Sequence, residues 1–330
     1  MSTIENPLLT IAIPTYNRSV FLDRALSYLS KQLKNDDLPV EVIVSDNCSI
    51  DDTENIVTKH IKDGLNIQYF KNAVNKGMDF NIAQCYLLAR GKYVLALGDD
   101  DFLLEGSLKL LTELLTGSDY GDVYFKSSGY NKNSKDSVDA DKFSYEEFSD
   151  PLIFIKKVHY YITFISGNIV NTKYLDREYM LNYLGTSLPQ VPFILEAIIS
   201  APKNAIINTV LLGVELDNTG GYNLFKVFGR NFNKIIDEAR AASPELIKKI
   251  KKVINRNLLI GFFPDYILRF RTNYKNDFIK ADPINELQTL YKGNFYFYLC
   301  CYPIAYLPKG IARIYRHGIK LFSKLRKLIS

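Results

Sequence analysis

The chain of 330 residues is 47% hydrophobic and 23% charged, which is the composition of an ordinary globular protein with room for one large domain or two smaller ones. Its four cysteines have neither metal-ligand nor disulfide spacing, which argues against a disulfide framework and indicates a reducing compartment. No apolar run reaches the roughly 18 residues that span a bilayer, and residues 1–10 show no signal-peptide pattern.

The first hundred residues alternate between short apolar runs and amphipathic segments. Strands are expected at 8–14, 40–45, 67–70 and 93–97, and helices at 20–33, about 53–62 and 79–89. Strands that alternate with helices in this way form a parallel sheet with helices on both faces. Ligands of such sheets lie at the carboxyl ends of the strands, so the loops that follow the strands are the candidate site.

The apolar run at 93–97 ends in Gly98 and three consecutive carboxylates, which are Asp99, Asp100 and Asp101. Like charges side by side repel and resist desolvation, so stability does not explain this cluster. Hard oxygen ligands suit Mg²⁺ or Mn²⁺, ions that usually share their coordination with substrate phosphates. The alternative is a helix at 103–115 that is capped by Asp101, with the other two acids near its positive end.

The other strand ends carry side chains suited to a nucleotide. Tyr16 is suited to stacking on a base and Arg18 to contacting a phosphate. Asp46 is suited to accepting a hydrogen bond from a base ring N–H, and Lys76 to neutralising phosphate charge. Each alone is more typical of an exposed loop, but their joint placement on one edge favours a nucleotide site. The sequence has no Walker A motif and no Gly-x-Gly-x-x-Gly motif, so those phosphate-binding modes are unsupported.

Four segments resemble family 2 glycosyltransferases, which have a GT-A fold and use nucleotide sugars. The segments are Ile13-Pro14-Thr15-Tyr16-Asn17-Arg18, Val44-Ser45-Asp46-Asn47-Cys48-Ser49 with Asp51 and Thr53, Asn75-Lys76-Gly77, and Gly91-Lys92-Tyr93-Val94 leading to the acidic cluster. The resemblance covers about the first 115 residues. It is closest to the branch that contains abequosyltransferase-like enzymes of bacterial O-antigen synthesis.

The resemblance implies roles for these residues. Those expected to line the nucleotide-sugar site are Pro14, Thr15, Tyr16, Arg18, Asn47 and Lys76, with Asp46 on the base and the acidic cluster holding a metal on the diphosphate. The usual family pattern is Asp-x-Asp followed by a further Asp. Aligned on 102–103, its first Asp falls on Gly98, so Asp99 and Asp101 are expected to face the site, with Asp100 as a further candidate.

The second half of the chain is less informative. Strands are expected at 122–125, 162–170 and 205–214, helices at about 190–200 and 224–241, and an exposed loop at 131–141. Inverting members of the family usually carry a Glu-Asp pair where this chain has Gln190, and an amide cannot take a proton. Glu196 is the nearby candidate base, or the enzyme retains configuration. The loop at 216–222 is either a plain turn or a flap that closes over a diphosphate with Tyr222.

The end of the chain is basic because no acidic residue follows Glu286. The basic residues there are Lys292, Lys309, Arg313, Arg316, Lys320, Lys324, Arg326 and Lys327. From residue 309 apolar residues recur at helical spacing between the cations, after an aromatic segment at 291–306. This pattern favours a helix lying in an anionic membrane surface. The alternative is a packed helix with a solvated basic face.

The sequence therefore predicts a GT-A domain at 1–242, with a nucleotide-sugar half at 1–115 and an acceptor half at 116–242, and a helical membrane-associating region at 243–330. The predicted protein is a metal-dependent glycosyltransferase on the inner face of the bacterial cell membrane. It transfers a sugar to a lipid-linked saccharide in surface-polysaccharide synthesis, with no nucleic-acid partner. The alternatives are a Mg²⁺-dependent nucleotidyltransferase, and a membrane- or nucleic-acid-binding adaptor with an inactive domain.

Overall fold

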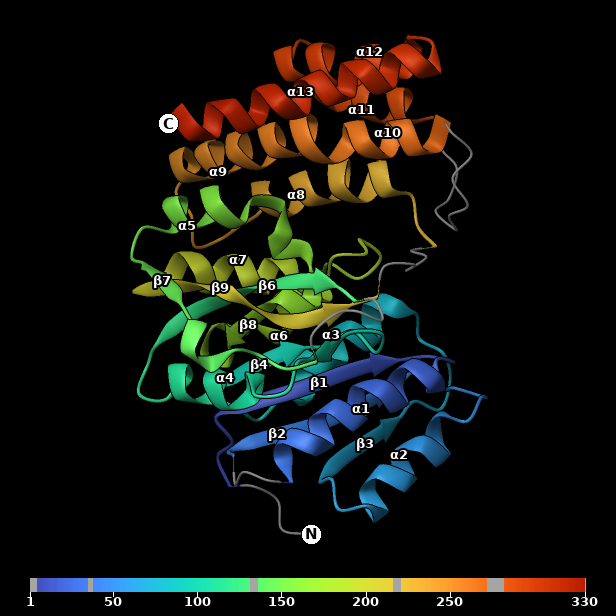
Figure 1. The fold of residues 1–330 in the computed structure, drawn as a ribbon, viewed down its shortest axis with the longest axis vertical. Helices are drawn as coiled ribbons and strands as arrows, with labels where there is room; N and C mark the ends of the chain where they lie inside the picture. The colour runs from blue at the N-terminus through green and yellow to red at the C-terminus, as the bar shows by residue number, and fades with distance from the viewer. Residues whose placement is uncertain (1–4, 35–37, 131–135, 216–220, 272–281, 330) are drawn as a thin grey trace. The chain divides into compact units, whose positions relative to one another are not determined.

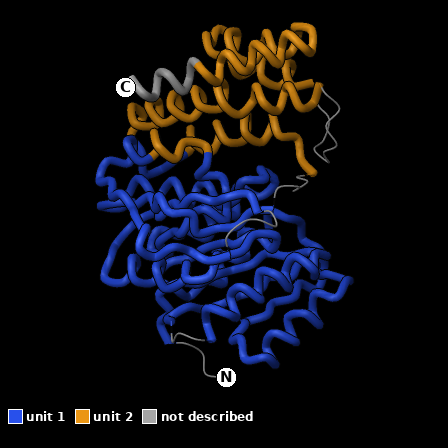
Figure 2. Tube along the Cα trace, viewed as in Figure 1, with its two compact units in different colours: residues 1–154, 161–217, 239–242 blue, residues 155–160, 218–238, 243–330 orange. Residues whose placement is uncertain are grey.

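The computed structural model describes residues 5–34, 38–130, 136–215, 221–271 and 282–329, with side chains as far as Leu321 in the last helix. The chain forms two compact units (Figure 2). Unit 1 comprises 1–154, 161–217 and 239–242, and unit 2 comprises 155–160, 218–238 and 243–330. The two units are described separately below.

Unit 1 is built on a mixed sheet, which has nine strands within the described residues. They are β1 Leu9–Thr15, β2 Val40–Asp46, β3 Ile67–Lys71, β4 Tyr93–Ala96, β5 Phe102–Leu103, β6 Tyr120–Gly129, β7 Tyr145–Phe148, β8 Asn168–Asn171 and β9 Lys203–Val214. Their order is β3-β2-β1-β4-β8-β6-β9-β5, with β7 also paired to β9. The first four strands run parallel, so their carboxyl ends meet at one edge.

Helices cover both faces of this sheet (Figure 1). They are α1 Ser19–Leu33, α2 Thr53–Lys62, α3 Met78–Leu88, α4 Ser107–Leu115, α6 Arg177–Leu181 and α7 Val191–Ser200. Alternate residues of β1 point to opposite faces: Ile11 packs with the core shared by α1 and α4, and Ala12 packs with Cys85 of α3. Burial on both faces explains why the parallel strands read as continuous apolar runs. The predicted GT-A architecture is confirmed.

Two predicted elements differ from the structure. The helix expected at 103–115 begins only at Ser107, because residues 102–103 form β5 against β9 and Phe102 stacks on Tyr28 with ring centroids 4.3 Å apart. Asp101 is therefore not a helix cap. The strand expected at 162–170 is formed only from residue 168. The preceding residues make 3₁₀ turns, because the Asn168 amide donates to the carbonyls of Ile162 and Phe164.

Unit 2 is helical. It contains α8 Phe232–Asp237, α9 Pro244–Asn257, α10 Phe263–Arg271, α11 Pro283–Tyr291, α12 Tyr302–Tyr306 and α13 Lys309–Ile329, with π-helical segments η5 Lys226–Asn231, η6 Leu258–Phe262 and η7 Phe297–Cys301. The helix α5 Pro151–Val158 spans the boundary between the units. Among the described residues, no helix combines the length and hydropathy needed to cross a membrane.

The side chain of Arg316 holds α13 on the rest of unit 2. It donates to both carboxylate oxygens of Asp265, at 2.7 and 2.9 Å, and to the carbonyls of Ile260 and Gly261 in η6. Lys320 also contacts Asp265, at 3.0 Å. Arg316 is buried, so it does not belong to the membrane-facing basic set that the sequence suggested. Its guanidinium thus donates to carbonyls of the π-helical segment η6.

Substituting Arg316 with Met should lower the free energy of unfolding by about 2–3 kcal/mol, because it leaves a half-buried carboxylate and two carbonyls without their charged donor. Arg313→Met removes the same charge from the exposed side of the same helix and should change stability by less than about 0.5 kcal/mol. Urea unfolding of both variants measures the difference. Equal midpoints would show that Arg316 does not anchor α13.

Candidate active site

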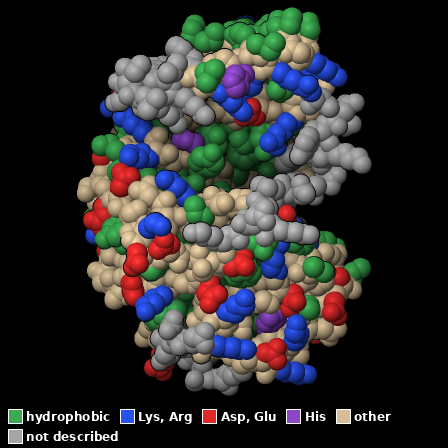
Figure 3. All heavy atoms as spheres, viewed as in Figure 1, with side chains coloured by type: hydrophobic (Ala, Val, Ile, Leu, Met, Phe, Trp, Pro, Cys, Tyr) green, Lys and Arg blue, Asp and Glu red, His purple; other side chains and the backbone are tan. Residues whose placement is uncertain are grey.

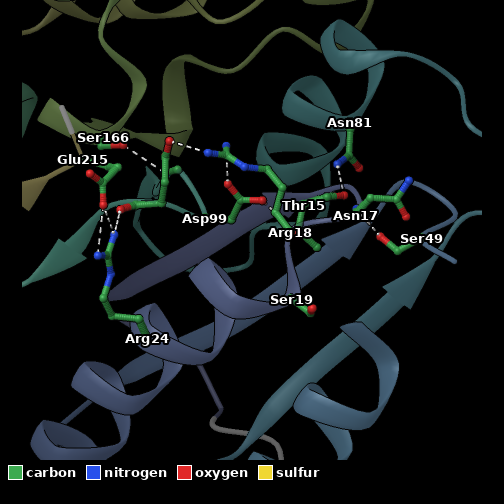
Figure 4. A network of polar contacts seen from close by, with 12 residues as sticks. Thr15, Asn17, Arg18, Ser19, Arg24, Ser49, Asn81, Asp99, Ser166 and Glu215 are labelled. Carbon is green, nitrogen blue, oxygen red and sulfur yellow. Dashed lines mark hydrogen bonds and ion pairs between the residues drawn. The ribbon is translucent and has the colours of Figure 1, made fainter. Parts of the chain in front are cut away.

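The candidate site lies at the carboxyl ends of β1, β2 and β4 in unit 1. Parallel pairing sets Thr15 at the end of β1 opposite Asp46 at the end of β2, and β4 runs on into the acidic cluster. Figure 4 shows the side chains of Thr15 and Arg18 directed toward Asp99. The structure therefore brings the predicted phosphate-contacting and acidic residues together at one sheet edge.

Arg18 joins two of the three carboxylates. Its Nη1 lies 2.8 Å from Asp99 Oδ1 and its Nη2 lies 2.8 Å from Asp100 Oδ2 (Figure 4). The Thr15 hydroxyl donates to Asp99 Oδ2 at 2.8 Å. The aspartates are each only 4% exposed, whereas the Arg18 side chain is 33% exposed. The guanidinium thus covers a buried acidic cluster and remains accessible from solvent.

Asp101 has different partners. Its carboxylate accepts hydrogen bonds from the Ser166 hydroxyl and the Glu215 backbone N–H. The pair expected from the sequence was Asp99 with Asp101, but the carboxylates that share Arg18 are Asp99 and Asp100. Residues preceding β8 and following β9 therefore complete the cluster, a connection that the local sequence around the acids does not contain.

Gly98 provides the space in which these oxygens converge. A Cβ on Gly98 would lie 3.1 Å from Asp100 Oδ1, 3.2 Å from Asp101 Oδ2 and 3.2 Å from Ser166 Oγ. The position where the family pattern places its first Asp is thus filled by oxygens of its neighbours. A side chain at position 98 would therefore crowd these oxygens.

The carboxylates are poorly balanced in charge. Burial raises the pKa of Asp99 to about 7 against the opposing effect of Arg18, and burial together with the neighbouring Asp100 raises the pKa of Asp101 to about 7. One guanidinium cannot neutralise three carboxylates, so a further cation would be stabilised here. The hard oxygens above Gly98 fit Mg²⁺ or Mn²⁺. In the described part of the chain, no group of three or more His, Cys, Asp or Glu is arranged so that it could hold a metal ion.

Arg24 is a site residue that sequence reasoning missed. Its Nη2 donates to the Asp100 carbonyl at 2.7 Å, and its Nη1 lies 3.1 Å from Glu215 Oε2. Arg24 follows Arg18 on α1, so the only available signal was a second cation on the helix after β1. Ser166 and Glu215 carried no signal, because tertiary pairing alone brings them to the cluster.

Asp46 and Asn47 organise the loops around the expected base site. Asp46 is fully buried, and its carboxylate accepts from the Ser49 N–H at 2.8 Å and from the Tyr69 hydroxyl at 2.6 Å. Asn47 donates to Asn75 Oδ1 at 2.8 Å and accepts from the Lys76 N–H at 2.9 Å. These contacts bring the two family motifs together, whereas a contact of Asp46 with a base remains a prediction.

The remaining predicted site residues vary in exposure. Tyr16 is 42% exposed at the site edge, as stacking on a base requires, and Pro14 is half-buried. The Lys76 ammonium lies 4.4 Å from the centroid of the Phe80 ring. Tyr222 belongs to unit 2, and the loop residues 216–220 that precede it lie outside the described residues. Its predicted role over a diphosphate therefore remains a prediction.

The acceptor-side candidates have structural partners. The Gln190 amide donates to the Thr163 carbonyl at 2.8 Å. The Glu196 carboxylate accepts from the backbone N–H groups of Arg240 at 2.6 Å and Ala241 at 3.0 Å. Glu196 thus caps a neighbouring chain segment, and this arrangement gives it no evident role as the base.

The comparisons with known proteins agree with this geometry. The model of the family described as Glycosyl transferase family 2 matches residues 10–179. The chain therefore belongs to the family 2 glycosyltransferases, and the predicted family is confirmed. The nucleotidyltransferase alternative is not retained.

Two bacterial glycosyltransferases are similar to part of this chain. Abequosyltransferase RfbV of Salmonella typhimurium is 30% identical over 210 residues, 59% of this chain and 62% of that protein. A GalNAc(5)-diNAcBac-PP-undecaprenol beta-1,3-glucosyltransferase of Campylobacter jejuni is 39% identical over 109 residues, 32% of this chain and 34% of that protein. The matches thus span under two thirds of these relatives.

The fold is shared with solved structures at low identity. S. aureus TarS 1-349 in complex with UDP-GlcNAc aligns with a TM-score of 0.61 and 18% identity over 94% of this chain and 88% of that one. The mannosyltransferase PcManGT from Pyrobaculum calidifontis in complex with GDP-Man and Mn2+ aligns with a TM-score of 0.53 and 14% identity, over 96% of this chain and 87% of that one. These likenesses support the fold alone.

The convergence of oxygens over Gly98 predicts the effect of one methyl group. Gly98→Ala should lower the free energy of unfolding by about 1–3 kcal/mol, because the new Cβ forces three buried oxygens apart. Gly310→Ala is the control, since a Cβ there meets no atom within 4 Å. Thermal or urea unfolding measures both. A Gly98→Ala variant as stable as the control would contradict the described packing.

Proposed function

We propose that this protein is a glycosyltransferase that moves a sugar from a nucleoside diphosphate sugar to a hydroxyl group of a lipid-linked saccharide. The observation that carries the proposal is the pairing of Arg18 with two of three buried carboxylates at the end of β4, in a chain of this family. The activities for which the abequosyl- and glucosyltransferase relatives are named support it, the second acting on an undecaprenol-linked saccharide. Bacterial surface-polysaccharide synthesis, such as O-antigen assembly, is the process that such an acceptor suggests.

Each residue of the site has a proposed task on the donor. Arg18 contacts the diphosphate, because a guanidinium fork matches phosphate oxygens. Asp99 orients Arg18 by accepting a hydrogen bond from its Nη1, and the Thr15 hydroxyl in turn holds Asp99 by donating to its other oxygen. Tyr16 stacks on the base and Asp46 accepts from its ring N–H. Lys76 adds positive charge beside the phosphates.

Asp100 and Asp101 are the proposed holders of Mg²⁺ or Mn²⁺, through the oxygens that converge above Gly98. A bound divalent ion supplies Lewis-acid neutralisation of the charge on the leaving diphosphate, which is worth several kcal/mol. Burial of the cluster strengthens every charge interaction within it, since the surroundings are drier than bulk water. Asp99 is less suited as a metal ligand, because both of its oxygens already accept hydrogen bonds.

Donor binding should depend on the metal and on Asp101. Asp101→Asn should weaken Mn²⁺-dependent binding of UDP or GDP at least tenfold, about 1.4 kcal/mol, because a carboxylate ligand is lost. Calorimetry with Mn²⁺ and with EDTA measures this, with Asp63→Asn at an exposed position as the control. Nucleotide binding that is equally tight in EDTA would argue against the metal, and no nucleotide binding at all would favour the inactive-adaptor alternative.

We further propose that unit 2 holds the enzyme on an anionic membrane, at the inner face of the cell membrane. On α13, Ile311, Ile314 and Leu321 are 53%, 75% and 50% exposed. Their spacing of three and seven residues places them on one face, opposite buried Ala312 and Arg316. An apolar stripe beside cations suits the interface of an anionic bilayer, in which the helix lies in plane. The exposed cations of this helix include Lys309 and Arg313.

An aromatic ladder lies in the same unit. Tyr298, Tyr302 and Tyr306 follow one another at 5.7 and 4.7 Å between ring centroids, and all three are exposed. The Tyr315 hydroxyl donates to the Leu299 carbonyl, which joins α13 to the segment that carries the ladder. Figure 3 shows hydrophobic side chains gathered over the part of unit 2 that contains α12. Tyrosines favour the boundary between lipid and water, since they have an apolar ring and a polar end.

Substitution of Ile311 and Ile314 with Ser should weaken binding to vesicles of phosphatidylglycerol and phosphatidylcholine at least tenfold. Each isoleucine side chain that becomes buried in the bilayer contributes about 1.5–3 kcal/mol to binding. Substitution of Lys309 and Arg313 with Gln should flatten the salt dependence. Point substitutions test the surface of α13 more cleanly than deletion of 309–330, because a deletion would also remove the buried Arg316. Sedimentation measures binding, with Ile50→Ser, at an exposed position of unit 1, as the control. Full-length protein that ignores these vesicles at low salt would refute the membrane role.

A further inference from the structure

The position of Arg18 implies competition with a cation. Its two terminal nitrogens lie 2.8 Å from oxygens of two different aspartates whose side chains are almost fully buried. The Arg18 side chain, itself one-third exposed, lies with its guanidinium carbon 4.8 Å from the centroid of the Phe21 ring. Arginine does not lose its proton in proteins, so this positive charge leaves the carboxylates only by movement of the side chain.

The two aspartates are engaged to different degrees. Asp99 is committed, because one oxygen accepts from Thr15 and the other from Arg18. Asp100 is shared: Oδ2 accepts from Arg18, and Oδ1 is one of the oxygens that converge above Gly98. A divalent ion bound at Oδ1 would therefore sit on the same carboxylate as the guanidinium. Two cations on one carboxylate repel each other, and burial weakens the screening of that repulsion.

We propose that Arg18 and a divalent metal ion compete for Asp100, and that the nucleoside diphosphate relieves this competition by drawing Arg18 onto its phosphates. The inference rests on the proposed function, because it takes a nucleoside diphosphate as the ligand. In the absence of nucleotide, Arg18 neutralises Asp100 and weakens metal binding. With nucleotide, the phosphates offer the guanidinium a stronger partner and Asp100 is released to the metal. The metal and nucleotide then increase each other's affinity by the same factor.

The test is the affinity of the protein for Mn²⁺ alone, measured from the spectrum of free Mn²⁺ by electron paramagnetic resonance. Arg18→Gln removes the competing charge, so it should bind Mn²⁺ at least fivefold more tightly than wild type without nucleotide. Arg18→Lys retains a charge that cannot span both carboxylates, so its Mn²⁺ affinity should lie between those of wild type and Arg18→Gln. Lys92→Gln removes one exposed cation from the residue before β4 and should leave the affinity unchanged.

The same titrations with saturating UDP or GDP separate the possible failures. The nucleotide should tighten Mn²⁺ binding much more in wild type than in Arg18→Gln, whose affinity for the nucleotide should fall at least tenfold. The competition alone would be overturned by the following pair of results. Without nucleotide, Arg18→Gln and Arg18→Lys bind Mn²⁺ no more tightly than wild type does, and with nucleotide, wild type does bind Mn²⁺. Absence of Mn²⁺ binding to wild type with either nucleotide would overturn the competition and the metal role together. Thermal unfolding checks that the variants are folded. If Arg18→Gln is not folded, the comparison of Arg18→Lys with wild type decides the test.

Discussion

The interaction on which the site depends is the pairing of one guanidinium with two buried carboxylates at the end of β4. Three consecutive aspartates that are each 4% exposed are tolerated only because every one of them has donors. Arg18 serves Asp99 and Asp100, Thr15 adds a bond to Asp99, and Asp101 is held by Ser166, which precedes β8, and by the Glu215 N–H, which follows β9. The loops of unit 1 are thus tied to one patch of charge.

A second set of contacts gives the patch its surroundings, and α3 makes most of them. Asn81 donates to the Thr15 and Ser45 carbonyls at the ends of β1 and β2. Two residues earlier, the Asp79 carboxylate accepts from the backbone N–H groups of Gly185 at 2.7 Å and Ser187 at 2.8 Å. Both of these residues have positive φ, so the carboxylate stabilises a strained turn. A single helix therefore fixes the donor loops and the segment that leads to Gln190.

The sequence allowed much of this fold to be predicted, because strand ends and helix starts are local. Thr15, Arg18, Asp46 and Asp99 follow apolar runs whose period reveals the sheet, and parallel pairing then brings them together. What failed was set by distant contacts. Phe102 lies in a strand rather than a helix because β9 pairs with it. Ser166, Glu215 and the burial of Arg316 depend on contacts between residues 51 to 191 positions apart, which no local pattern records.

The absence of a side chain at Gly98 limits how this acidic motif can change. A Cβ added at 98 would already lie 3.1 to 3.2 Å from oxygens of Asp100, Asp101 and Ser166, and an Asp there would add a fourth acid to one dry pocket. Removing Asp101 first would instead leave Ser166 and the Glu215 N–H without their acceptor. Each single step is unfavourable, so the shifted motif and the usual one behave as alternative solutions that only paired substitutions interconvert.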